Sequence, residues 1–77
     1  MTRAMKKALN RIAKRYAWAK SWREAYRHDA GPARIEYQAR CSSLAYCWQE
    51  MMNSIDGKDY SEVEPRQIRE RRKDASS

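Results

Sequence analysis

Residues 37–55, YQARCSSLAYCWQEMMNSI, carry the most regular apolar pattern in this chain of 77 residues. Apolar side chains recur there at alternating intervals of four and three residues. That spacing places them on one face of an α-helix that packs along its whole length. Pro32 precedes the stretch and Gly57 follows it, so we predict a helix over residues 33–56. The positions of this stripe are Tyr37, Cys41, Leu44, Trp48, Met51 and Ile55.

Another helix is predicted for residues 2–28, which contain no glycine or proline and are rich in alanine, lysine and arginine. Thr2 is a suitable N-cap for it. An apolar stripe with the same spacing runs from Met5 to Ala19 and is interrupted at Arg23. The break over residues 29–32 is short, so the two helices should pack antiparallel as an αα-hairpin within residues 1–57.

After the hairpin, the sequence predicts a linker over residues 58–64 and a short basic helix with a frayed tail over residues 65–77. That third helix should reach about Lys73.

The expected fold is all-α, and its oligomeric state follows from the amount of apolar surface. The two stripes together with Trp18 and Trp22 exceed what a two-helix interface covers. We therefore expect a homodimer in which two hairpins form a four-helix bundle. The alternative is a monomer whose third helix folds back over the hairpin through Val63 and Ile68.

The composition argues against several functional classes. No apolar run approaches the roughly 20 residues of a transmembrane helix, so we expect no membrane association. Cys41 and Cys47 would have Cα atoms about 9 Å apart on one helix, too far for a disulfide, which favours free thiols and a cytoplasmic location. With His28 as the only histidine and no glycine-rich loop, the sequence predicts no metal, no cofactor and no enzymatic activity.

Positive charge is concentrated at the start of the chain. Residues 1–28 hold nine Lys and Arg against one acid, Glu24, in a protein whose formal net charge is +7. A distribution this uneven is typical of a surface that meets nucleic acid or an acidic partner.

The helix over residues 2–28 carries the best candidate site. Lys7, Arg11 and Arg15 form one stripe along it, and Trp18 and Trp22 continue that stripe. Cations neutralise phosphates and indole rings stack on bases, so the stripe suits nucleic acid. The predicted contacts to nucleic acid or an acidic partner are Lys7, Arg11, Lys14, Arg15 and Arg23. The predicted partner interface is Trp18, Trp22 and Tyr26, and a secondary basic arm is Arg66, Arg69, Arg71, Arg72 and Lys73.

Two functions fit this pattern. The first is a non-enzymatic accessory or regulatory protein that binds nucleic acid or a nucleoprotein complex through the basic helix face. The alternative is a protein-binding inhibitor or adaptor that docks through Trp18, Trp22 and neighbouring arginines, since aromatic and arginine side chains anchor interfaces. In size and style, though in no motif, such a chain is similar to phage- or plasmid-encoded regulators of a host or defence machine.

Overall fold

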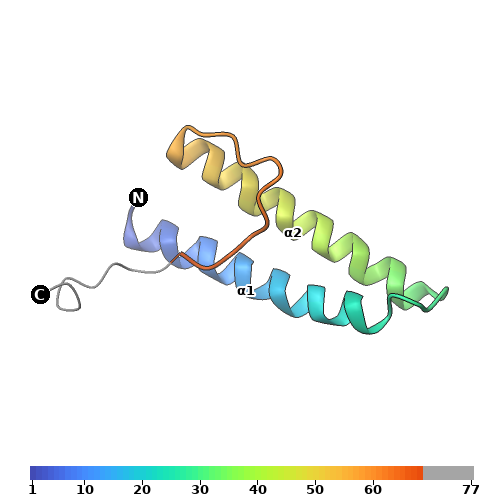
Figure 1. Cartoon of the computed structure of the whole chain (residues 1–77). Coiled ribbons are helices and arrows are strands. Elements are labelled where there is room, and N and C mark those ends of the chain that lie inside the picture. The colour runs from blue at the N-terminus through green and yellow to red at the C-terminus, as the bar shows by residue number, and fades with distance from the viewer. Residues whose placement is uncertain (69–77) are drawn as a thin grey trace, which may run out of the picture.

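Two long helices form the body of the protein. The computed structural model describes residues 1–68, which contain α1 (Arg3–Ala25) and α2 (Pro32–Asp56) and no strand. The helices pack against each other as an antiparallel hairpin, and their free ends splay apart (Figure 1). The predicted all-α class and the helical hairpin are therefore confirmed.

The ends of the helices follow from local hydrogen bonding. Thr2 Oγ1 accepts a hydrogen bond from the backbone N–H of Met5 at 3.1 Å and so caps the start of α1. Residues 26–28 form a turn, and α1 ends three residues before the predicted position, His28. Asp29 then accepts the N–H of Gly31 at 2.9 Å. Gly31 is the N-cap of α2.

Glycine at position 57 stops α2. Its φ of 73° lies in the left-handed region, which glycine adopts without the penalty that a Cβ brings.

The core lies between the predicted stripes and has two parts. One cluster near the splayed ends contains Leu9, Ala13, Trp48 and Met52. The other, nearer the hairpin turn, contains Tyr16, Ala19 and Cys41. Both cysteines are free thiols, as predicted.

The C-terminal segment, residues 58–68, corrects the predicted linker and third helix. Residues 61 and 62 form a turn, residues 63–68 are extended, and the segment runs back from the end of α2 across α1 (Figure 1). Pro65 restricts Glu64 to β-type backbone angles, and hydrogen bonds that Gln49 and Asn10 make with the backbone of Val63 and Ile68 hold the rest of the segment in its extended form. A helix from residue 65 to 68 is therefore wrong, and the rest of the predicted helix, residues 69–73, lies outside the described residues.

Side chains of the hairpin hold this C-terminal segment in place. Val63 and Ile68 pack against the cluster that contains Leu9. The monomeric alternative predicted this contact, but it placed the two residues in or near a third helix, whereas they lie in an extended, non-helical segment. Asn10 exchanges two hydrogen bonds with the backbone of Ile68: the Ile68 N–H donates to Oδ1 at 2.6 Å, and Nδ2 donates to the Ile68 carbonyl at 3.1 Å. Gln49 Nε2 likewise donates to the carbonyl of Val63 at 2.9 Å.

Candidate nucleic-acid interface

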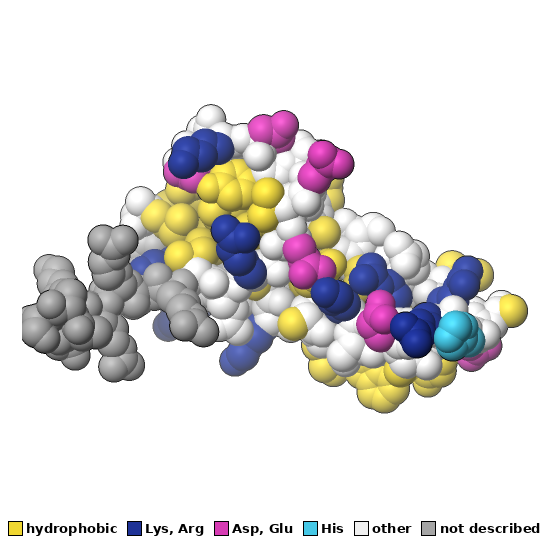
Figure 2. Space-filling model, in the orientation of Figure 1, with side chains coloured by type: hydrophobic (Ala, Val, Ile, Leu, Met, Phe, Trp, Pro, Cys, Tyr) yellow, Lys and Arg dark blue, Asp and Glu magenta, His cyan; other side chains and the backbone are white. Residues whose placement is uncertain are grey.

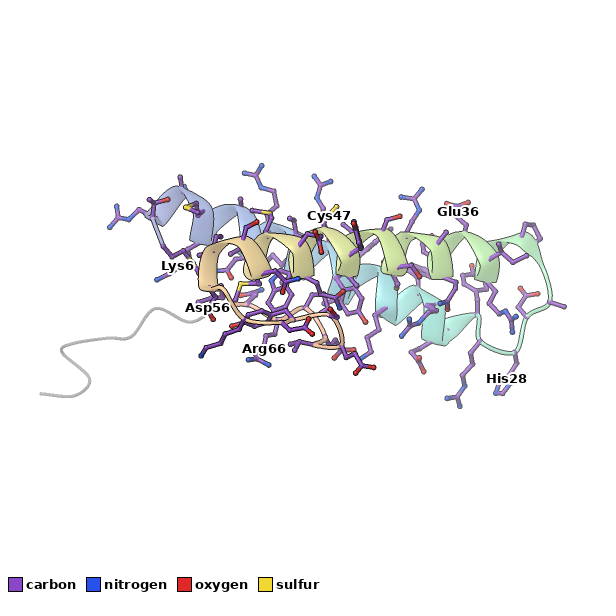
Figure 3. The ribbon with its side chains drawn as sticks, turned by 90° about the horizontal axis from the view of Figure 1, so that it is seen from above. Lys6, His28, Glu36, Cys47, Asp56 and Arg66 are labelled. Carbon is purple, nitrogen blue, oxygen red and sulfur yellow. The ribbon has the colours of Figure 1, made fainter. Side chains whose placement is uncertain are left out.

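The C-terminal segment distinguishes the two sides of the hairpin. One side of the hairpin carries the C-terminal segment, including Arg66, and we call it the segment side (Figure 3). Glu36 and Cys47 of α2 point to the opposite side (Figure 3). On the side of the segment, Lys and Arg side chains lie among Asp and Glu toward the hairpin turn (Figure 2). The opposite side of the hairpin, where Glu36 lies, carries the first part of the candidate interface.

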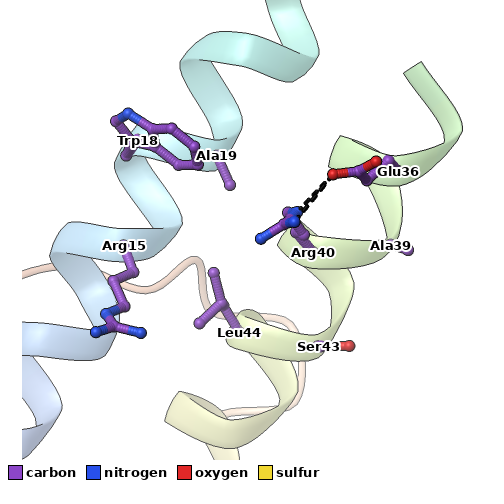
Figure 4. A pocket seen from close by; sticks show the side chains of 8 residues that line it. All are labelled: Arg15, Trp18, Ala19, Glu36, Ala39, Arg40, Ser43 and Leu44. Carbon is purple, nitrogen blue, oxygen red and sulfur yellow. Dashed lines mark hydrogen bonds and ion pairs between the residues drawn. The ribbon is translucent and has the colours of Figure 1, made fainter. Parts of the chain in front are cut away.

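Between the helices on this opposite side lies an open groove of about 620 Å³, which we call the α1–α2 groove. Trp18 stands at its rim, Leu44 points across toward α1, and Arg40 reaches in from α2 (Figure 4). Arg40 is paired with Glu36, whose carboxylate lies 2.9 Å from its guanidinium. The full lining is Arg15, Trp18, Ala19, Glu36, Ala39, Arg40, Ser43 and Leu44.

Three of the predicted basic residues gather nearer the N-terminal end of α1 than the groove. Lys7, Arg11 and Lys14 line a shallow hollow of about 310 Å³ together with Asn10 and Gln67. All three cations are exposed. Neither they nor Arg15 has a hydrogen bond or an ion pair to any residue within 1–68. The hollow marks where the C-terminal segment reaches the basic side of α1.

Arg23 lies apart from the other predicted contacts. It lines a different hollow with Arg27, Arg34 and Ile35, and its guanidinium is 4.0 Å from the carboxylate of Glu24.

The predicted aromatic residues form one cluster near the hairpin turn. Trp22 stacks on Tyr26 and on Tyr37, with ring centroids 6.0 and 5.9 Å apart. Trp18 instead meets Trp22 and Tyr37 edge to face, at 6.4 and 5.9 Å. Trp18 remains 54% exposed and Trp22 39%. Tyr37, which the sequence assigned to the core stripe only, belongs to this cluster.

Arg66, the first member of the predicted basic arm, is exposed on the side of the C-terminal segment. The other members, Arg69, Arg71, Arg72 and Lys73, lie outside the described residues.

Titratable contacts of the hairpin serve its structure. Lys20 Nζ lies 2.7 Å from Glu64 Oε2, and the hydrogen bond from Lys20 holds the pKa of Glu64 below its ordinary value. Burial, followed by the hydrogen bond to Glu64, raises the pKa of Tyr16. These contacts fasten the C-terminal segment to α1.

Within residues 1–68, no cluster of three or more His, Cys, Asp or Glu side chains could hold a metal ion. No described helix is both long and apolar enough to cross a membrane.

Sequence reasoning missed the contribution of α2 to the groove. Ala39, Arg40 and Ser43 lie off the apolar stripe and have the composition of a solvent-facing surface. The spacing of Glu36 and Arg40 signalled a helical ion pair, but only the packing of α2 against α1 sets that pair opposite Arg15 and Trp18.

Comparison of the chain with protein-family models, curated proteins and solved structures found no match.

Proposed function

We propose that this protein is a small non-enzymatic accessory or regulatory protein that binds nucleic acid, free or within a nucleoprotein complex, through the basic side of α1. The main support is the contrast between the two halves of that helix. Toward its C-terminal end, Lys20 and Arg23 each have a carboxylate within 4.0 Å, and so does Arg27 in the turn that follows. Lys7, Arg11, Lys14 and Arg15 have none among the described residues.

Unpaired cations in a row are suited to a phosphate backbone. Lys7 and Arg15 are eight residues apart, or about 12 Å along the helix axis. Phosphates of one strand of DNA follow each other at about 3.4 Å along the duplex axis, so this row spans three to four phosphate intervals. Because no described carboxylate competes for these side chains, binding phosphate breaks no internal ion pair.

The basic arm predicted from the sequence adds to this support. Ile68, the last described residue, is hydrogen-bonded to Asn10, and Asn10 lies beside Lys7 and Lys14 in one hollow. The last described residue before the rest of this arm therefore lies next to the unpaired cations of α1.

The test is the salt dependence of binding. Lys7, Arg11 and Arg15 are changed together to Gln, and binding to labelled single- and double-stranded oligonucleotides is followed by fluorescence anisotropy between about 50 and 200 mM NaCl. With one phosphate met by each cation, the slope of log Kd against log salt should fall by about 2 on a single strand, at roughly 0.7 for each contact.

The control variant removes the same charge elsewhere, through Arg27→Gln, Arg34→Gln and Lys58→Gln. It should leave the slope close to that of the unchanged protein. Equal losses in the two triple variants would mean that net charge, and not the α1 row, governs binding. No binding by the unchanged protein at the lowest salt would refute the proposal.

The exposed aromatic cluster supports the alternative of a protein-binding inhibitor or adaptor. Trp18 and Trp22 sit together at the surface beside Arg15, which is the composition of an interface anchor. In that case Trp18→Ala should abolish binding to the partner protein with little dependence on salt, whereas the double variant Lys7→Gln and Arg11→Gln should retain it.

The homodimer stays a prediction. A symmetric pairing through the side of the hairpin opposite the C-terminal segment would set like surfaces against each other. Arg15 of each copy lines the groove on that side, so positive charge would gather in the interface and oppose association at low salt. Light scattering after size-exclusion chromatography, at low and high salt, gives the mass. If this face is the dimer interface, the dimer should be favoured by salt.

A further inference from the structure

We propose that the nucleic acid is bound as a single strand, with one base inserted into the α1–α2 groove against the indole of Trp18. This inference rests on the proposed function, since it specifies the form of nucleic acid that the same surface accepts.

The orientation of Trp18 is the first observation. Both of its aromatic neighbours, Trp22 and Tyr37, meet it edge to face, at interplanar angles of 64° and 69°. No described ring therefore stacks parallel to this indole, and 54% of the residue is exposed. Two neighbours nevertheless constrain the ring, so a base can stack on it with little loss of side-chain entropy.

Trp22 provides the contrast. Its ring lies at 22° to Tyr26 and at 18° to Tyr37, so it already takes part in two stacked contacts. Trp18 is thus the tryptophan that has no parallel ring beside it among the described residues, and it is the one that lines the groove.

The groove beside Trp18 has the chemistry that a base requires. Ala19, Ala39 and Leu44 supply apolar surface, while Ser43 and the Glu36–Arg40 pair supply hydrogen-bond donors and acceptors. Its volume of about 620 Å³ lies within the roughly 300–1,000 Å³ of sites that hold small ligands.

Charge selects the occupant. Arg15 is one helical turn before Trp18 and has no ion pair among the described residues, and Lys7 and Arg11 continue the row along α1. A strand whose base enters the groove can place its neighbouring phosphates on this row. Single-strand binders combine the same parts, namely a basic track and an aromatic platform, whereas a duplex keeps its bases paired and stacked.

The experiment compares a labelled single strand of about 15 nucleotides with the duplex of the same sequence, by anisotropy at about 50 mM NaCl. The unchanged protein should bind the single strand more tightly. Trp18→Ala should weaken single-strand binding by about 5- to 150-fold, which is the loss of stacking on one base, and should leave duplex binding unchanged.

Two further variants test the groove itself and an aromatic residue outside it. Ala39→Met places a larger side chain in the groove without altering charge or removing Trp18, and it should also weaken single-strand binding selectively. Tyr46→Ala removes an aromatic ring that is 63% exposed and lies outside the groove lining, and it should have no effect. Circular dichroism confirms that each variant is folded. If Trp18→Ala unfolds the chain, Ala39→Met decides the outcome.

The results separate the two proposals. Equal affinity for strand and duplex, or variants in the groove that bind both as the unchanged protein does, overturns the single-strand inference and leaves the basic row as a nucleic-acid contact. Absence of binding to either oligonucleotide overturns both proposals and leaves Trp18 as a protein-docking residue.

Discussion

Removal of the Asn10 amide should release the end of the C-terminal segment while the hairpin stays folded. Asn10 makes both of its hydrogen bonds to the backbone of Ile68, and both are partly buried. A hydrogen bond contributes about 0.5–1.5 kcal/mol net, and water replaces part of it at a half-exposed site. We therefore expect Asn10→Ala to weaken the attachment of Ile68 by about 1–2 kcal/mol.

The effect should be local because other contacts hold the segment upstream. Asn53 Oδ1 accepts the backbone N–H of Tyr60 at 2.6 Å, Gln49 binds the carbonyl of Val63, and Lys20 pairs with Glu64. None of these contacts involves Asn10.

Native-state hydrogen exchange measures the release directly. In Asn10→Ala, the amide of Ile68 should exchange about 5–30 times faster, which corresponds to a loss of one to two kcal/mol. Amides in the middle of α2 should be unchanged. Asn10→Asp keeps an oxygen that accepts the Ile68 N–H but sets a second carboxylate oxygen against the Ile68 carbonyl, so its Ile68 amide should exchange more slowly than in Asn10→Ala and faster than in the unchanged protein. Unchanged exchange at Ile68 in the Ala variant would refute the reasoning, and faster exchange throughout α2 would show that Asn10 supports the whole hairpin.

Three further predictions concern titration, backbone strain and thiol access. The hydrogen bond from Lys20 lowers the pKa of Glu64, so the stability that Glu64 contributes is present above the ordinary carboxyl pKa and is lost as the pH falls through the lowered value. On acidification from about pH 7 to about pH 2, Glu64→Gln should therefore lose less stability than the unchanged protein. Equal losses of stability in the two proteins would contradict this. Gly57→Ala should reduce the free energy of unfolding, measured in urea, by about 1–2 kcal/mol, because the φ of 73° strains a residue that has a Cβ. A Cβ there would have no described neighbour within 4 Å, so no clash adds to this strain. An unchanged urea midpoint would show that the turn relaxes. Mass spectrometry after alkylation at neutral pH should find one adduct on the folded chain, at the exposed Cys47, and a second adduct only after unfolding. The reason is that Cys41 is buried and that burial raises the pKa of its thiol. Rapid labelling of both cysteines in the folded chain would contradict the packing.

Helix-forming information is local, which is why the hairpin could be predicted. The stripe from Tyr37 to Ile55, the absence of breakers before residue 29 and the Gly57 stop each depend on residues close in sequence. The end of the first helix was misplaced by three residues, because the turn over residues 26–28 is decided by competing short-range hydrogen bonds.

The C-terminal segment could not be predicted in the same way. Its extended form depends on Asn10 and Gln49, which are 58 and 14 residues away from their backbone partners. An amide side chain in a helix looks like an ordinary surface residue until the packed fold brings a second backbone to it. The apolar surface predicted to require a second copy is partly covered by this segment through Val63 and Ile68.

The basic row of the candidate site was visible in the sequence, since Lys7, Arg11 and Arg15 follow helical spacing on one element. Which cations are free was not visible. Glu64 neutralises Lys20 from across the fold, and Arg23 turns to another side, so the row ends at Arg15.

The sequence alone determined the two helices, their apolar faces and the placement of positive charge on the first, because helix periodicity and composition act over a few residues. Only the tertiary structure decided which side of the hairpin the C-terminal segment covers and which side remains open. It also decided that Trp22 is stacked while Trp18 stands at the rim of a groove. These features arise between residues distant in the chain, where packing and hydrogen bonds across elements select one arrangement that no local pattern encodes.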